Sequence, residues 1–341
     1  MSTDARLADL TTLRIGGPAD RLVTVTTEED LIAAIRDADA ARQPALLLSG
    51  GSNVVISDEG FRGTVIRIAT TGIRVDADAC SGAMVRIAAG EDWDGVVQRA
   101  IAEGWSGLES MSGIPGLTGS TPIQNVGAYG HEVAETIAWV RVWDRGDNQV
   151  RTVFAADCGF TYRSSHFKLD PTRYAVLEVA FQLPLGDLSA PIGYPELARV
   201  LDVEIGSRAP MTEVREAVLG LRRSKGMVLD ESDHDTWSAG SFFTNPIVAT
   251  PADIPAGAPQ WPQPDGRVKT SAAWLIEHAG VRKGFAIGNA AVSTKHTLAM
   301  TNRGDATAKE LLALAGHVRN QVRDSFGITL VNEPVLVNCT L

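Results

Sequence analysis

The stretch GLESMSGIPGLTGSTPIQNVGAYG, from Gly107 to Gly130, contains six glycines and two prolines and follows neither a helical nor a strand period. Long irregular loops in compact domains are usually either functional or disordered. The apolar residues of this stretch, among them Leu108, Ile114 and Val126, argue against disorder, so we expect an ordered loop. Glycine lets backbone N–H groups approach an anion closely, and successive turned amides form anion-binding nests. The stretch alone predicts either a pyrophosphate-binding loop or a structural one.

A second glycine loop, LLLSGGSNVVI from Leu46 to Ile56, lies between two apolar, strand-like runs. Two such loops within the first 130 residues suggest that both bind one extended dinucleotide. No G-x-G-x-x-G opens a helix after a strand, and no G-x-x-x-x-G-K-[ST] occurs in the chain. The sequence therefore disfavours both a Rossmann NAD site and a Walker nucleotide site.

The composition is that of an ordinary globular protein with 341 residues, 44% hydrophobic and 21% charged. A net charge of −10 disfavours nucleic acids and anionic membranes as partners. The N-terminal MSTDARLADL lacks an apolar signal-like core, and no run of about 18 apolar residues could span a bilayer. Cys80, Cys158 and Cys339 are odd in number and widely spaced, which predicts a cytoplasmic protein without disulfides. No histidine has metal-ligand spacing, so we expect no metal.

The pattern of apolar residues, caps and turn residues predicts a chain of mixed helices and strands, whose N-terminal part is a small α/β unit. One expected helix begins at the Thr26–Glu29 capping box. Four more are expected at Asp92–Glu103, Thr212–Lys225, Ser271–Ala279 and Ala308–Phe326. Expected strands are Ala45–Leu48, Thr64–Ala69, Val85–Ala89, Ala138–Trp143, Gln149–Phe154 and Ala175–Leu183, with a closing pair at Ile328–Val331 and Val335–Val337. The segment 184–210 is predicted to be a turn-rich connection or inserted loop.

The motifs LSGGSNVV, IPGLTGSTPIQNVGAYG and GSFFTNP together resemble the UDP-N-acetylenolpyruvoylglucosamine reductases, which are flavoproteins of the vanillyl-alcohol-oxidase type. The resemblance extends from TTLRIGGPA at Thr11 to Glu333. It implies a bipartite FAD-binding domain of that (PCMH) type and a C-terminal α+β substrate-binding domain. The implied divisions are FAD-binding subdomain 1 at 1–68, completed by 327–341, subdomain 2 at 69–210, and the UDP-sugar substrate-binding domain at 211–326.

The resemblance also implies an activity, in which UDP-N-acetylglucosamine enolpyruvate is reduced to UDP-N-acetylmuramate in peptidoglycan precursor synthesis. Non-covalent FAD would be the cofactor, NADPH the hydride-donating co-substrate, and no protein partner is evident. Ser241 in GSFFTNP matches the family's proton donor, Arg163 in FTYRSSHFK the arginine that faces the substrate carboxylate, and Glu333 the glutamate opposite it. Without the resemblance, Ser241 would be read as a turn serine and Arg163 as a surface arginine.

The remaining implied site residues fall into two sets. FAD contacts are expected from Gly50, Gly51, Ser52, Asn53, Gly116, Gly119, Ser120, Gln124, Asn125, Gly127, Ala128, Tyr129 and Tyr162. Substrate contacts are expected from Tyr194, Lys225, Asn245, His296 and Trp261, with Tyr194 as the lid of the family's tyrosine-loop type.

Two other functions stay open from the sequence. One is an alcohol or sugar oxidase of the same superfamily, which commonly tethers flavin through histidine or cysteine. Neither glycine loop contains a cysteine, but His131 directly follows the second loop. The other is a non-catalytic nucleotide-binding protein, which would have no need of a proton donor at Ser241.

Overall fold

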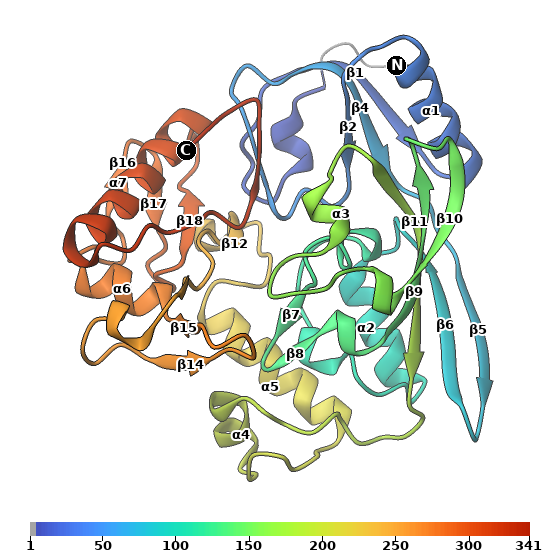
Figure 1. Cartoon of the computed structure of the whole chain (residues 1–341). Coiled ribbons are helices and arrows are strands. Elements are labelled where there is room, and N and C mark those ends of the chain that lie inside the picture. Colours follow the sequence, from blue (N-terminus) through green and yellow to red (C-terminus); the bar gives the residue numbers. More distant parts are fainter. Residues whose placement is uncertain (1–4) are drawn as a thin grey trace. The chain divides into compact units, whose positions relative to one another are not determined.

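The computed structural model describes residues 5–341, and the chain divides into two compact units. The first unit contains Asp20–Gly50 and Arg62–Ser224. The second contains the described residues 5–19 together with Gly51–Phe61 and Lys225–Leu341. Each unit combines helices and strands (Figure 1), as the sequence pattern predicts. The predicted divisions at residues 68, 210 and 326 stay a prediction, and each unit is described by itself.

The first unit is built on an antiparallel five-stranded sheet in the order β10-β9-β11-β6-β5. Figure 1 shows these strands side by side. Their bounds are β5 Ile73–Asp78, β6 Gly82–Ala88, β9 Ile137–Asp144, β10 Gln149–Phe154 and β11 Tyr174–Leu183. The predicted hairpin is confirmed, since Gln149 pairs with Asp144 and Phe154 with Trp139. Strand β5 was not predicted, although its residues IRVDAD alternate between apolar and polar as those of a half-buried strand do.

A smaller sheet, in the order β1-β4-β2, precedes the large one in the sequence. Its strands are β1 Ala19–Val25, β2 Ala45–Leu48 and β4 Phe61–Ile68, and β2 runs parallel to β4. Helix α1, Glu28–Ala40, connects β1 to β2 and begins where predicted. The Thr27 side chain accepts a hydrogen bond from the Asp30 amide at 3.1 Å, which satisfies one of the helix's unpaired N–H groups.

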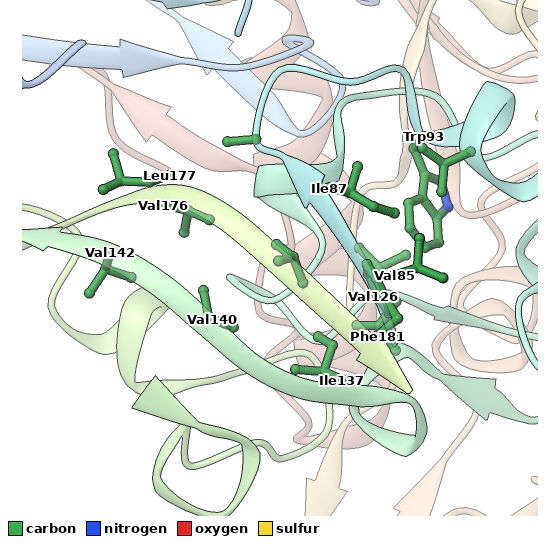
Figure 2. Close-up of a cluster of buried hydrophobic side chains, with 14 of the residues drawn as sticks. Val85, Ile87, Trp93, Val126, Ile137, Val140, Val142, Val176, Leu177 and Phe181 are labelled. Carbon is green, nitrogen blue, oxygen red and sulfur yellow. The ribbon is translucent and has the colours of Figure 1, made fainter. Parts of the chain in front are cut away.

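The core of the first unit holds one end of the long glycine loop. Side chains of β6, β9 and β11 gather around Trp93 and Val126 (Figure 2). The Trp93 and Phe181 rings lie 5.8 Å apart. Burying apolar area stabilises a fold by about 25 cal/mol per Å², and burial of Val126 anchors the end of the long glycine loop in this core.

The first unit also contains four helices after α1. They are α2 Trp93–Ala102, α3 His166–Leu169, α4 Pro195–Leu201 and α5 Met211–Ser224. Helices α2 and α5 confirm the predictions. The turn-rich reading of 184–210 was incomplete, because α4 lies within it. Pro195 occupies the first turn of α4, where a missing N–H costs nothing, but the helix is short and lacks a side-chain cap.

The second unit contains three small sheets. Parallel strands β3 Val54–Ile56 and β19 Val335–Val337 form the first. The second has the order β12-β18-β17-β16, with bounds Ser238–Ser241, Ala299–Asn302, Ala290–Val292 and Ala286–Ile287. The third has the order β13-β15-β14, with bounds Ile247–Val248, Val268–Thr270 and Gln260–Pro262. The first of these sheets joins the C-terminal strand to the first glycine loop.

Helices α6, Ala272–His278, and α7, Ala308–Phe326, complete the second unit. The predicted capping box of α7 is present, with Thr307 and Glu310 each bonded to the other's backbone N–H. The predicted closing strand pair was half wrong, since 328–331 is not a strand. There the Val331 carbonyl accepts the Thr244 amide at 3.0 Å instead.

Short elements complete the assignment. Strands β7 Gly127–Ala128 and β8 His131–Glu132 form an antiparallel pair in the first unit. The 3-10 turns are η1 Leu7–Leu10, η2 Glu109–Met111, η3 Thr118–Ser120, η4 Val133–Glu135, η5 Ala155–Asp157, η6 His234–Thr236 and η7 Pro251–Asp253.

A buried acid closes the β9–β10 hairpin and provides a stability test. The Asp144 side chain is fully buried and accepts Arg173 Nε and Nη2, each at 3.0 Å. The hydrogen bond from Arg173, which outweighs burial, holds the pKa of Asp144 below its ordinary value. We expect Asp144→Asn to lower the free energy of unfolding by about 1–3 kcal/mol, measured by urea denaturation at neutral pH.

The sign of its pH dependence follows from the lowered pKa. The stabilisation from Asp144 is fully present above the unfolded pKa of about 3.9 and is lost as the pH falls through the lower folded pKa. The difference between wild type and Asp144→Asn should therefore vanish in acid. Asp76→Asn, which removes an exposed partner of Arg86, should change stability far less. Equal effects of both substitutions would contradict this account.

Candidate functional site

The two glycine loops meet in the first unit. A Cβ at Gly50 would lie only 2.6 Å from the Cα of Gly116. A Cβ at Gly119 would lie 2.5 Å from the Cβ of Ala89. Real Cβ atoms do not approach so closely, so these glycines allow the two loops and the end of β6 to pack backbone to backbone. This contact is a physical reason for the glycines besides anion binding.

The contact has polar groups that fit a ligand. The Ser49 hydroxyl, directly before Gly50, is buried and has no hydrogen-bond partner among residues 5–341. An unbonded buried hydroxyl is costly in a native fold. A bound group with a polar edge, such as a dinucleotide, would satisfy it. The residues at this place therefore fit the cofactor that the sequence predicts.

An ion pair that the sequence analysis missed supports the middle of the long loop. Asp94 on α2 accepts both Arg215 Nη atoms at 2.8 Å and the Gly113 amide at 2.6 Å. Burial alone would raise the pKa of Asp94, but the Arg215 fork and the Gly113 amide hold it below its ordinary value. A charged acid thus anchors the loop to α2 and α5. The only sequence signal was Asp94 in the first turn of a helix, where acids are common.

A second missed residue, Glu109, is buried at the start of the same loop. It is 1% exposed, and its two carboxylate oxygens accept the amides of Gly107 and Ala190, both at 2.7 Å. It therefore joins the loop to the segment that leads to Tyr194. A glutamate within a glycine-rich loop was a visible signal, but its partner lies 81 positions away.

The last part of the long loop is held by Asn125. This residue has φ +46° and is buried. Its amide group donates to Glu132 Oε2 at 2.6 Å, and its carbonyl oxygen accepts the Ala134 amide at 3.1 Å. The side chain proposed for flavin contact thus has a structural role in this loop.

Tyr129 lies near the end of the loop, at φ +51°. Burial raises the pKa of Tyr129 to about 12, against the opposing effect of the Arg222 charge. The hydroxyl therefore stays protonated at neutral pH. Its ring packs edge-to-face against Tyr194, with centroids 5.4 Å apart.

Arg163 lies in the first unit, in a tight turn. It has φ +55°, and its Nη2 donates to the Gly127 carbonyl at 2.8 Å. Its guanidinium lies 5.3 Å from the centre of the Tyr162 ring, and Lys168 Nζ donates to its carbonyl at 3.1 Å. These contacts bring Arg163 and Tyr162 to the end of the long glycine loop.

Ser241 and Glu333 lie together in the second unit. Ser241 ends β12, and the next residue, Phe242, accepts the Glu333 amide at its carbonyl at 2.9 Å. Phe243 forms a β-bridge with Asn332. This short ladder brings the two predicted catalytic residues near each other, although they are far apart in the sequence.

Asn53, in the first glycine loop, contacts the segment that contains Glu333. The Asn53 carbonyl accepts the Val335 amide at 3.0 Å, and its side-chain amide lies 3.4 Å from the Glu333 carbonyl. Gly51 has φ +61°, and a Cβ there would lie 2.0 Å from the Leu10 carbonyl oxygen. The second unit thus gathers Asn53, Ser241 and Glu333, while the boundary between the units falls after Gly50.

The predicted substrate residues are spread over both units. Tyr194 is 40% exposed and is the N-cap residue of α4 in the first unit. In the second unit, Asn245 Oδ1 accepts the Ala272 amide at 3.0 Å, and Trp261 is an exposed residue of β14. His296 is half-buried before β18, and Lys225 follows the end of α5.

The other predicted flavin contacts lie in turns and short elements. Ser120 ends η3 and donates to the Leu117 carbonyl at 2.7 Å, Gln124 lies in the next turn, Ala128 ends β7 and Ser52 follows Gly51. Within residues 5–341, no cluster of three or more His, Cys, Asp or Glu side chains could hold a metal ion. The helices described over the same range include none that is long and apolar enough to cross a membrane.

Comparison with known proteins identifies the class and then the family. Residues 19–153 match the family model of an FAD binding domain, and residues 231–337 match that of the UDP-N-acetylenolpyruvoylglucosamine reductase C-terminal domain. The fold is therefore that of an FAD-binding α+β flavoprotein, as predicted.

Whole-chain relatives define the particular family. UDP-N-acetylenolpyruvoylglucosamine reductases of Cutibacterium acnes and Streptomyces avermitilis are each 56% identical to the chain, cover 99% of it, and are themselves covered to 90% and 95%. The crystal structure of the Thermus caldophilus enzyme has a TM-score of 0.66 at 28% identity and covers 98% of this chain, with 97% of its own chain covered. The chain belongs to the UDP-N-acetylenolpyruvoylglucosamine reductase family.

Proposed function

We propose that this chain is a flavin-dependent oxidoreductase that uses NADPH to reduce UDP-N-acetylglucosamine enolpyruvate to UDP-N-acetylmuramate, in the synthesis of peptidoglycan precursors. Membership of the family supports the reaction. The observation that carries the assignment of residues is the ladder that joins Phe242, beside Ser241, to Glu333. The predicted cytoplasmic location and independence of a protein partner are part of the proposal.

FAD, when bound, supplies to the substrate the hydride that it has taken from NADPH. Gly50 and Gly116 would let the backbone of the two loops approach the cofactor, with the Ser49 hydroxyl as a donor. Asp94 and Glu109 would keep the loop in shape, because both carboxylates are already bonded to loop amides.

Ser241 and Glu333 are proposed to act on the enolpyruvyl group. Hydride addition at the terminal carbon leaves negative charge on the carbon next to the carboxylate. Ser241 would give a proton to that carbon, since a hydroxyl need only be more acidic than the carbanion that it quenches. Glu333, in its protonated form, would donate a hydrogen bond to the substrate carboxylate as charge develops there. The ladder between them fixes both backbones, which favours a defined geometry.

Arg163 is proposed to bind the substrate carboxylate. A guanidinium offers two parallel N–H donors to a carboxylate and stays charged throughout the reaction. The hydrogen bond from Nη2 to the Gly127 carbonyl restricts the side chain before substrate arrives. Pre-ordering of this kind lowers the entropy that binding must lose.

The sugar nucleotide is proposed to contact Tyr194, Lys225, Asn245, His296 and Trp261. Lys225 is suited to a pyrophosphate, which a flexible ammonium meets as a point charge. Tyr194 is partly exposed beside Tyr129 and would cover the nucleotide. The Asn245 carbonyl oxygen already caps α6, so its amide N–H₂ would be the group facing substrate.

The optical spectrum tests the proposal directly. We expect the purified protein to show flavin absorbance, to bleach with NADPH without oxygen, and to recover when UDP-N-acetylglucosamine enolpyruvate is added. Denaturation should release the flavin. His131 is not expected to carry it covalently, because both of its ring nitrogens form hydrogen bonds within the protein, to Glu135 and Pro191. Flavin that stays with the denatured chain would favour the oxidase alternative. A reduced protein that fails to recover with the substrate would contradict the proposed reaction.

A further inference from the structure

We propose that His131 is a positioning residue that holds the segment 188–194, here the tyrosine segment, against the long glycine loop. The inference rests on the proposed function, because it assumes that Tyr194 at the end of this segment covers the substrate nucleotide. It adds a residue that acts through Tyr194 and does not itself touch the substrate.

The imidazole bridges two separate elements. His131 Nε2 lies 3.0 Å from the Pro191 carbonyl oxygen, and Nδ1 lies 2.7 Å from Glu135 Oε2. Only 13% of the His131 side chain is exposed. Pro191 precedes Tyr194 by three positions, so the bond fixes the backbone just before the tyrosine.

The ring is oriented from its other side. Glu135 Oε1 accepts the Glu132 amide at 3.0 Å as part of the capping box of η4. The same carboxylate therefore fixes the start of η4 and one nitrogen of His131. Both partners of the imidazole, the Pro191 carbonyl and the Glu135 carboxylate, are hydrogen-bond acceptors. The contact with Glu135 therefore fixes the orientation of the ring toward the Pro191 carbonyl.

The tyrosine ring benefits from this arrangement. Tyr194 packs edge-to-face on Tyr129, with an interplanar angle of 89°. A Cβ at Gly130 would lie 3.6 Å from the Gly193 carbonyl carbon and the Tyr194 nitrogen, so the two backbones pass close together there. The tyrosine segment is thus ordered before substrate binds, and less entropy is lost on binding.

A second anchor makes the effect of His131 measurable without loss of the fold. Glu109 holds the Ala190 amide at 2.7 Å, and the Leu188 carbonyl accepts Ser106 Oγ at 2.9 Å. Removal of the His131 bonds should therefore loosen the segment near Tyr194 without detaching it. We expect an effect on binding larger than that on the chemical step.

The test uses the FAD-loaded enzyme and His131→Phe, which keeps a ring but removes both nitrogens. We expect the KM for UDP-N-acetylglucosamine enolpyruvate to rise about tenfold. This change corresponds to the loss of the one hydrogen bond that reaches the tyrosine segment, the bond to the Pro191 carbonyl. The kcat should stay unchanged, since uniform binding energy affects KM alone. His131→Gln, which keeps an amide donor, should recover part of the loss.

A readout independent of activity is hydrogen–deuterium exchange of residues 188–201 in the FAD-loaded enzyme without substrate. Exchange should be faster in His131→Phe than in wild type. His278→Phe is the matched control, because its Nδ1 also contacts a carbonyl oxygen, that of Trp274 at 2.8 Å, on a helix of the second unit. It should change neither the exchange of 188–201 nor the KM. Should His131→Phe fail to fold, Glu135→Gln, whose side chain is half exposed, should give the same changes on a smaller scale.

The Tyr194→Ala background separates this inference from the proposed function. Tyr194→Ala should raise KM, and adding His131→Phe should raise it no further if His131 acts through the tyrosine. If Tyr194→Ala raises KM while His131→Phe leaves KM and exchange unchanged, the inference is overturned and the proposed function stands. If Tyr194→Ala leaves KM unchanged, the substrate role of Tyr194 and the inference both fail. A wild-type enzyme without turnover overturns the proposed function, and the exchange measurement alone then decides whether His131 holds the segment.

Discussion

Ser241→Ala is expected to retain flavin reduction by NADPH but to lower turnover of UDP-N-acetylglucosamine enolpyruvate by about 10³-fold, within the range for removal of a proton donor. Alanine fits the last position of β12, whose pairing with Ala299 on β18 involves the backbone. The substitution should therefore leave FAD content and stability close to those of wild type. Stopped-flow absorbance measures the two half-reactions separately, and only the reoxidation by substrate should slow.

Thr244→Val is the matched control for this experiment. Thr244 lies in the same GSFFTNP motif, and its amide donates to the Val331 carbonyl at 3.0 Å. Valine removes a hydroxyl from the same ladder and keeps the backbone contact, so both half-reactions should proceed as in wild type. Reoxidation at the wild-type rate in Ser241→Ala, or an equal loss in Thr244→Val, would remove Ser241 from the role of proton donor.

Local signals in the sequence predicted the long helices and most strands of the five-stranded sheet. The apolar stripe and the Thr307 and Glu310 caps of α7 are contiguous in the chain, so periodicity and capping rules gave its bounds. The same holds for α2, where Asp92 accepts the Gly95 amide at 2.8 Å. Helix α4 was missed because it is short and lacks a side-chain cap. Strand β5 was missed although its six residues alternate between apolar and polar.

The shape of the candidate site depends on contacts that no local pattern shows. Glu109 and Ala190 are 81 positions apart, and His131 and Pro191 are 60 apart. Such pairs depend on how the whole fold places both segments, which no local pattern in a single sequence shows. The glycine loops were predicted to bind a ligand, but the close approach of Gly50 to Gly116 was not predicted.

The family resemblance supplied what periodicity could not. The strand Val335–Val337 was visible as an apolar run. Its pairing with Val54–Ile56 was not visible, because the two strands are far apart in the sequence. That pairing also sets the position of Glu333, which lies two residues before the strand and bonds to Phe242. Motif matching named Glu333, and the ladder gives the physical reason for its place.

Glu333→Gln is expected to lower turnover of UDP-N-acetylglucosamine enolpyruvate by about 10²- to 10³-fold, because its amide N–H is a far weaker acid than the carboxyl O–H that is proposed to stabilise the developing charge. Glutamine has nearly the same size, and the Glu333 amide keeps its bond to the Phe242 carbonyl. FAD binding and flavin reduction by NADPH should therefore stay at wild-type levels. Stopped-flow reoxidation by substrate measures the effect, with flavin content from the absorbance spectrum.

Asp324→Asn is the matched control for the carboxyl group. Asp324 is another acid near the C-terminus, but it lies on α7, is 62% exposed and pairs with the adjacent Arg323. An exposed pair of this kind contributes little, so turnover and stability should match wild type. Wild-type turnover in Glu333→Gln would exclude an essential carboxyl group at this position. A loss confined to Asp324→Asn would place the acid on α7 instead, because the two substitutions remove the same chemical group from different elements of the second unit.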